Sequence, residues 1–120
     1  MDNNKFPAEE QEAPALEVVT DNTTYVHKFA EPFEYEGKKY PSLTFRFGNM
    51  KGKDVLAITQ ELRSRGIVLV TRNFEVDYQY RYAVQCCEEN IGNDLLLALP
   101  VKDFDAICQA VQRFLVSMGR

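Results

Sequence analysis

The stretch that decides the fold is FEYEGKKYPSLTFRFGNMKGKDVLAITQEL, residues 33–62. In its first half, apolar and polar residues alternate on both sides of a short polar connection, residues 36–39. The alternating apolar residues are Phe33, Tyr35, Leu43, Phe45 and Phe47. Alternation with a period of two is typical of strands that bury one face. Because Gly37 can adopt a positive φ within the connection, this half predicts an antiparallel β-hairpin.

The second half of the stretch predicts a helix that begins at Lys53 or Asp54 and ends at Arg65. The Asp54 side chain can cap the first turn, and Gly66 can end the helix in the left-handed conformation. One face of this helix carries a stripe of residues that we expect to pack on the apolar face of the hairpin. The stripe consists of Val55, Ile58, Thr59 and Leu62.

Between the hairpin and this helix, residues 48–54 resemble a phosphate-binding loop in part. The spacing from Gly48 to Gly52 is one residue shorter than that loop needs. Lys53 is followed by Asp54, where the loop has a Ser or Thr whose hydroxyl binds Mg²⁺. Because the Asp54 carboxylate would also repel phosphate, the sequence predicts no nucleotide site here.

Upstream of the hairpin, the sequence predicts an acidic tail and one interrupted strand. Of the net charge of −4, −3 falls within the first 14 residues, whose composition cannot bury enough apolar surface to offset the entropy of ordering. Residues 15–20 are either a strand or part of this tail. We place the flexible tail at residues 1–20 and a single domain at residues 21–120. Residues 24–36 favour one strand that is broken at Pro32, which cannot donate to a ladder.

Downstream of the first helix, the apolar run at residues 67–71 predicts a buried strand, which would lie beside the hairpin. Further helices are predicted for residues 78–89, capped by Asp77, for residues 94–99 and for residues 101–118. The last of these has the strongest helical periodicity in the chain. The sequence therefore predicts an α+β fold, in which an N-terminal antiparallel β-hairpin, with or without a third strand, packs on three to four α-helices.

Composition argues against several classes of function. Outside the tail the chain is nearly neutral, whereas nucleic-acid binding needs clustered Lys and Arg. No apolar run reaches the length of a membrane span and the N-terminus lacks a signal core, so we expect a cytoplasmic protein without membrane contact. The three cysteines, Cys86, Cys87 and Cys108, are odd in number and lack metal-ligand spacing. We expect them to be reduced core residues, and we expect no metal and no cofactor.

The single histidine, His27, is the only residue that would suit general base chemistry near neutral pH. No Ser, Cys or carboxylate is recognisably placed in the sequence to work with it. We therefore expect His27 to lie on the surface of a strand, and we expect no catalytic site. The helix that carries Tyr78, Tyr80 and Tyr82 is either covered on both faces or leaves one face for a partner, since tyrosine is favoured at interfaces.

A series of short motifs runs through most of the predicted domain. They are FEYEGKKY at 33–40, LTF at 43–45, GKDVLAI at 52–58, IGND at 91–94, LP at 99–100, KDF at 102–104 and FL at 114–115. In this order and spacing they resemble the tail assembly chaperones of long-tailed bacteriophages and prophages. The resemblance implies a small, non-enzymatic protein of the infected bacterium's cytoplasm. Such a protein binds the tape measure protein, keeps it soluble and delivers it to tail tube assembly.

The resemblance also implies contact with the tail tube protein through a frameshifted, longer form, and it leaves self-association open. A tape measure protein is a long amphipathic helix, so its holder needs an apolar surface with a polar rim. We expect that surface on the tyrosine helix and the last helix. The expected partner-binding residues are Tyr78, Tyr80, Tyr82, Phe114 and Met118. The alternative is a structural tail or head-completion adaptor that is retained in the virion.

Overall fold

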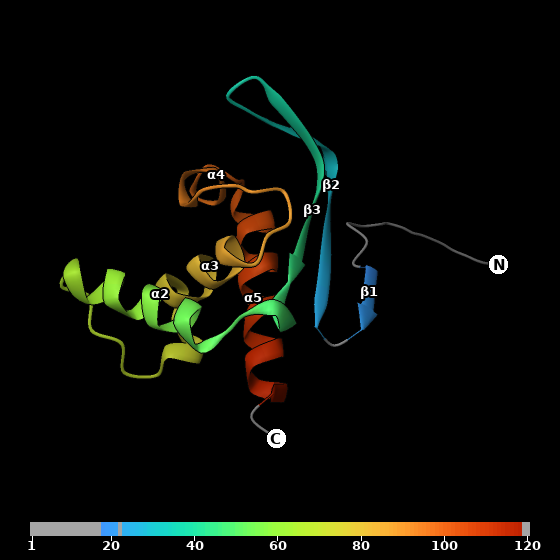
Figure 1. Cartoon of the computed structure of the whole chain (residues 1–120). Helices are drawn as coiled ribbons and strands as arrows, with labels where there is room; N and C mark the ends of the chain where they lie inside the picture. Colours follow the sequence, from blue (N-terminus) through green and yellow to red (C-terminus); the bar gives the residue numbers. More distant parts are fainter. Residues whose placement is uncertain (1–17, 22, 119–120) are drawn as a thin grey trace.

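The computed structural model describes residues 18–21 and 23–118 of the chain, and within them it has the predicted α+β fold (Figure 1). A β-hairpin near the N-terminus is followed by the helices. The strands are β1 (Val18–Asp21), β2 (Thr24–Tyr35) and β3 (Lys38–Arg46). The helices are η1 (Phe47–Asn49), α2 (Gly52–Ser64), η2 (Arg72–Phe74), α3 (Val76–Gln85), α4 (Asn93–Leu97) and α5 (Val101–Met118). Within this described part, no helix combines the length and the apolar character that crossing a bilayer requires.

The predicted hairpin is confirmed, with a tighter turn than expected. Tyr35 pairs with Lys38, so that only Glu36 and Gly37 form the turn. Both have positive φ, 51° and 81°. Two positive φ values in a two-residue turn match the right-handed twist of the flanking strands. Glycine adopts this conformation without strain, which is why Gly37 directs the hairpin here.

The third strand of the sheet comes from the N-terminal side. The strand order is β1-β2-β3, and both pairings are antiparallel. The strand alternative for residues 15–20 therefore holds from Val18 onward, and the expected boundary after residue 20 passes through β1. The rest of the expected tail, residues 1–17, lies outside the described residues.

A bulge interrupts the hairpin at its middle, where the two strands lose their matched spacing. Lys28 pairs with Ser42 and Phe33 pairs with Tyr40, so that residues 29–32 lie opposite Pro41 alone. Neither Pro32 nor Pro41 has an N–H to donate, and a ladder of hydrogen bonds cannot continue across them. The expected break at Pro32 is thus a bulge within one strand. Beyond it, the outer part of the hairpin extends past the helices and curves towards the side of α4 (Figure 1).

The helices gather on one side of the hairpin, and α5 runs alongside it (Figure 1). The core combines residues from the hairpin, α2, α3, α4 and α5. Its most deeply buried members include Leu43, Phe45, Ile58, Leu62, Tyr78, Leu96, Ile107 and Val111. The apolar stripe of α2 packs chiefly against α3, where we had expected the hairpin. The hairpin face is instead covered by α3 and α5, whose apolar residues share its core.

The predicted helix at residues 78–89 begins and ends earlier than expected. Its first residue is Val76, with Glu75 at the N-cap position where we had expected Asp77. It ends at Gln85 because the next residues pair with the outer edge of β3. The Arg46 N–H donates to the Cys86 carbonyl over 2.9 Å, and the Glu88 N–H donates to the Thr44 carbonyl over 2.8 Å. Covering part of an exposed strand edge in this way protects it from unwanted pairing.

The start of α2 corrects the predicted role of Asp54. Lys51 holds the N-cap position, and Asp54 lies in the first turn. The Asp54 carboxylate reaches back and accepts a hydrogen bond from the Lys51 N–H, over 2.9 Å. It therefore stabilises the helix start from three residues downstream, and its charge also suits the positive end of the helix. Gly66, with φ of 77°, ends the helix region as predicted.

Candidate partner-binding surface

The expected tyrosines are core residues in this structure. Tyr78, Tyr80 and Tyr82 are 1%, 6% and 2% exposed. The Tyr82 hydroxyl donates to the Phe47 carbonyl over 3.2 Å, and burial raises the pKa of both Tyr78 and Tyr82. Phe114 is half-buried, with its ring centroid 5.4 Å from that of Phe47. None of these four rings offers an open surface.

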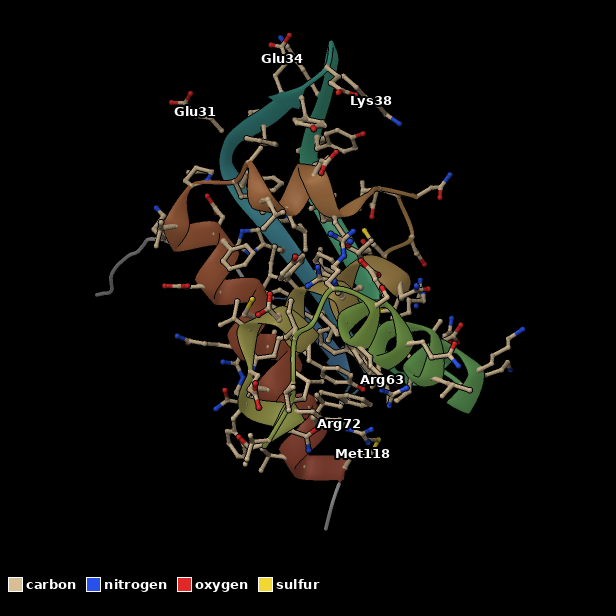
Figure 2. The ribbon with its side chains drawn as sticks, turned by 90° about the vertical axis from the view of Figure 1, so that its left-hand side faces the viewer. Glu31, Glu34, Lys38, Arg63, Arg72 and Met118 are labelled. Atoms are coloured by element: carbon tan, nitrogen blue, oxygen red, sulfur yellow. The ribbon has the colours of Figure 1, made fainter. Side chains whose placement is uncertain are left out.

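Of the expected partner-binding residues, Met118 is the exception. It is 60% exposed at the end of α5. Figure 2 places it at the same end of the molecule as Arg63 and Arg72, away from the hairpin tip that carries Glu34 and Lys38. The structure thus separates Met118 from the tyrosines with which the sequence had grouped it.

The two most exposed large apolar side chains of the described residues lie on a segment that the sequence misassigned. Residues 67–71 do not form the predicted buried strand, and Val68 and Val70 are 81% and 86% exposed. Ile67 and Leu69 alternate with them and turn towards the core. Its β-branched residues favour an extended strand, but in the described part of the chain the segment pairs with no strand, and the backbone bends at Val70 and Thr71.

A single carboxylate fixes the backbone of this segment in place of a strand ladder. The N–H groups of Val70 and Thr71 both donate to Oε2 of Glu75, over 2.8 and 2.7 Å. The Ile67 N–H donates to the Leu62 carbonyl over 2.9 Å. These bonds satisfy backbone donors that a loop would otherwise leave to solvent, and so they hold the two valines in their outward positions.

The segment lines one hollow, and Phe74, three residues further along the chain, lines another. The first has a volume of about 520 Å³ and is lined by residues 67–70 together with Thr59, Arg63 and Arg72. The second, of about 340 Å³, lies where Phe74 meets the last turns of α5. Phe74 is itself 59% exposed. We name the surface formed by Val68, Val70 and Phe74, with Arg63 and Arg72, the loop face.

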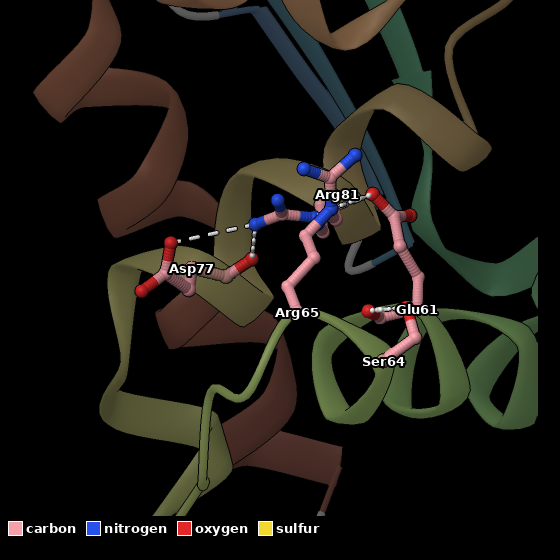
Figure 3. A network of polar contacts seen from close by, with 5 residues as sticks. All are labelled: Glu61, Ser64, Arg65, Asp77 and Arg81. Atoms are coloured by element: carbon pink, nitrogen blue, oxygen red, sulfur yellow. Dashed lines mark hydrogen bonds and ion pairs between the residues drawn. The ribbon is translucent and has the colours of Figure 1, made fainter.

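An ion-pair network braces the two ends of this segment (Figure 3). The Arg81 side chain, 7% exposed, donates to the Glu61 carboxylate over 3.2 Å and to the Asp77 carbonyl over 3.0 Å. Arg65 joins the same Glu61 carboxylate over 3.3 Å. Arg81 also stacks over the Tyr80 ring, 4.7 Å from its centroid. Because the network links the end of α2 to the start of α3, it fixes the base from which the loop face projects.

His27 is buried, and the expectation of a surface histidine is wrong. It is 2% exposed, and its Nε2 lies 2.7 Å from Oδ1 of Asp103, in the first turn of α5. Its Nδ1 lies 2.8 Å from the Tyr25 hydroxyl. A neutral imidazole has one N–H, so the carboxylate assigns that proton to Nε2 and the tyrosine O–H donates to Nδ1. His27 and Asp103 are 76 positions apart in the chain, which explains why the sequence pattern did not reveal this contact.

The cysteines lie in or against the core, as predicted. Cys86 and Cys108 are buried, Cys87 is half-buried, and all three are free thiols. Burial raises the pKa of Cys87 and of Cys108 to about 12. A protonated thiol is a poor nucleophile and a poor metal ligand. Within the described residues, no group of three or more His, Cys, Asp or Glu side chains could hold a metal ion.

In comparisons with protein-family models, with curated proteins and with solved structures, no match to this chain was found.

Proposed function

We propose that this protein is a tail assembly chaperone of a long-tailed phage or prophage. In this proposal it acts in the bacterial cytoplasm, binds the tape measure protein and keeps that protein soluble until the tail assembles. The motifs at residues 33–40 and 52–58 support the proposal by resemblance. The structural observation that carries it is the loop face, where apolar side chains stay exposed on a braced segment.

The loop face has the chemistry that an amphipathic helix requires. Val68 and Val70 leave most of their apolar surface in water, and covering a valine side chain contributes about 1.5–3 kcal/mol. Arg63 and Arg72 line the hollow beside them and can meet acidic groups on the polar side of a helix. Since the segment is already fixed by Glu75, binding would cost little additional ordering of the backbone.

The proposal is tested by co-expressing the protein with the tape measure protein of the phage or prophage that encodes it. The soluble fraction of the tape measure protein should rise well above that with an unrelated protein of similar size, and the two should elute together on size exclusion. An unchanged soluble fraction would contradict the proposal.

Mass spectrometry of purified virions separates this function from that of a retained adaptor. A chaperone leaves before the particle is complete, so the protein should be absent or far below the copy number of tail proteins. Stoichiometric presence in the particle would contradict the chaperone and support the adaptor.

A further inference from the structure

We propose that a third hollow, at the bulge of β2, binds the positively charged side chain of a protein partner, an arginine or a lysine. This bulge hollow has a volume of about 360 Å³ and lies between the bulged residues of β2 and the first turn of α5. That volume is at the small end of the range for ligand sites. The lining residues that determine its chemistry are Phe29, Phe33, Glu31, Glu34, Lys102 and Asp103.

Two aromatic rings supply the apolar part of the site. Phe29 and Phe33 are half-buried, and their centroids lie 5.8 Å apart with the planes tilted by 32°. The bulge brings them together, because it removes residues 30–32 from the regular alternation of the strand. Aromatic faces attract ammonium and guanidinium groups and cover the methylene stems that carry them.

Carboxylates outnumber cations around the bulge hollow. Glu31, Glu34 and Asp103 line it, against one cation, Lys102. Among the described residues, no ion pair joins Lys102 to any of the three carboxylates. In the described part of the chain, Glu31 and Glu34 have no ion-pair partner either, so the lining keeps an excess of negative charge, which favours a cation and repels phosphate or an acidic segment.

One of these carboxylates is held rigidly. Asp103 is 9% exposed, and its Oδ1 accepts the 2.7 Å hydrogen bond from His27. His27 in turn touches Phe29 edge to face, with ring centroids 5.0 Å apart. The buried network beneath the hollow thus fixes both a charged and an aromatic part of its lining. A binding group that is already ordered costs less conformational entropy when the ligand arrives.

The bulge hollow is independent of the tape measure proposal. Glu31 and Glu34 lie at the hairpin end of the molecule, and Arg63 and Arg72 lie at the opposite end (Figure 2). The two surfaces also carry opposite charge. A partner could engage both surfaces, and a negative result at one surface would leave the proposal for the other unaffected.

The test uses the ¹⁵N-labelled full chain and a capped arginine, acetyl-arginine methylamide, as the probe. We expect saturable amide shifts confined to residues 29–34 and 101–103. The capped citrulline has the same shape but carries no charge. It should bind about fivefold more weakly, because it cannot form the exposed ion pair with the carboxylates. Equal binding of the two probes, or shifts spread over unrelated surfaces, would overturn the proposal.

Variants of exposed residues complete the test without disturbing the core. The double variant Glu31→Gln and Glu34→Gln should raise the dissociation constant for capped arginine about fivefold, whereas Lys102→Ala should lower it about twofold. Glu36→Gln, at the hairpin turn outside the hollow, is the matched control and should leave it unchanged. An unaltered constant in the double variant would overturn the proposal.

Free L-arginine distinguishes a partner side chain from a free amino acid as the ligand. A site for the amino acid would also hold its α-ammonium and α-carboxylate groups. Markedly tighter binding of free L-arginine than of the capped form would therefore overturn the assignment to a protein partner. Similar affinities would support that assignment.

Discussion

At the scale of single residues, Asp103 links the hairpin to the last helix through buried His27. Asp103→Ala would leave the imidazole N–H without an acceptor, and a buried donor left unsatisfied costs about 2 kcal/mol of unfolding free energy. Urea unfolding measures this loss. Asp105→Ala, on the exposed side of the same helix turn, controls for the helix dipole and should change stability by less than about 0.5 kcal/mol. Equal losses in the two variants would contradict the role of His27.

The buried thiols predict a loss of stability in alkaline solution. Burial raises the pKa of Cys108 from 9.0 to about 12, so the folded chain keeps a proton that the unfolded chain releases between these values. The unfolded state then binds fewer protons, and the free energy of unfolding falls as the pH rises from about 9 towards 12. Urea unfolding at several pH values measures this slope. Cys108→Ala removes one such group and should make the slope shallower. An identical slope in the variant would contradict a contribution of the Cys108 thiol to the pH dependence.

At the scale of elements, Arg81 joins α2 to α3 through Glu61 and Asp77. Arg81→Met keeps the apolar stem but removes the charged hydrogen bonds, which are worth about 2 kcal/mol for a buried guanidinium. Arg65→Met removes a bond to the same Glu61 carboxylate from a side chain that is 60% exposed, and should cost less than about 0.5 kcal/mol. Thermal or urea unfolding compares the two variants. A loss as large for Arg65 as for Arg81 would show that burial of Arg81 contributes nothing.

The segment at residues 67–71 shows why an apolar run does not identify its own partner. Its β-branched residues predict an extended strand, but residues 67–71 form no strand and the backbone bends at Val70 and Thr71. A buried strand also needs a neighbouring edge. In this structure β1 pairs with one side of β2, and residues 86–88 pair with the outer edge of β3. Half of the run therefore remains on the surface, and the sequence pattern alone could not show this.

At the scale of the whole molecule, the loop face should be dispensable for folding and required for partner binding. The double variant Val68→Ser and Val70→Ser changes two exposed side chains, so the free energy of unfolding should shift by less than about 0.5 kcal/mol per site. The soluble yield of co-expressed tape measure protein should fall towards the level without this protein. Leu97→Ser, a comparably exposed apolar residue on α4, is the control and should leave that yield unchanged. Full activity of the double variant would move the binding surface elsewhere.

The candidate site could be predicted only in part. Met118 was expected to bind a partner, and the structure leaves it exposed at the end of α5. The burial of the tyrosines could not be predicted, because i and i+4 spacing shows which residues share a helix face and not which face is covered. Neighbouring helices cover both faces of α3, and a hydrophobic stripe has the same pattern whether it meets the core or a partner.

The sequence by itself determined the elements whose cause is local. The turn at Gly37, the capped start of α2 and the long apolar periodicity of α5 each depend on residues a few positions apart. The tertiary structure alone decided which surfaces stay open. It joined His27 to Asp103, ended α3 where the chain pairs with β3, and left Val68 and Val70 in water. Such contacts join residues that are far apart in the chain, so the pattern of neighbouring residues does not show which of the possible contacts will form.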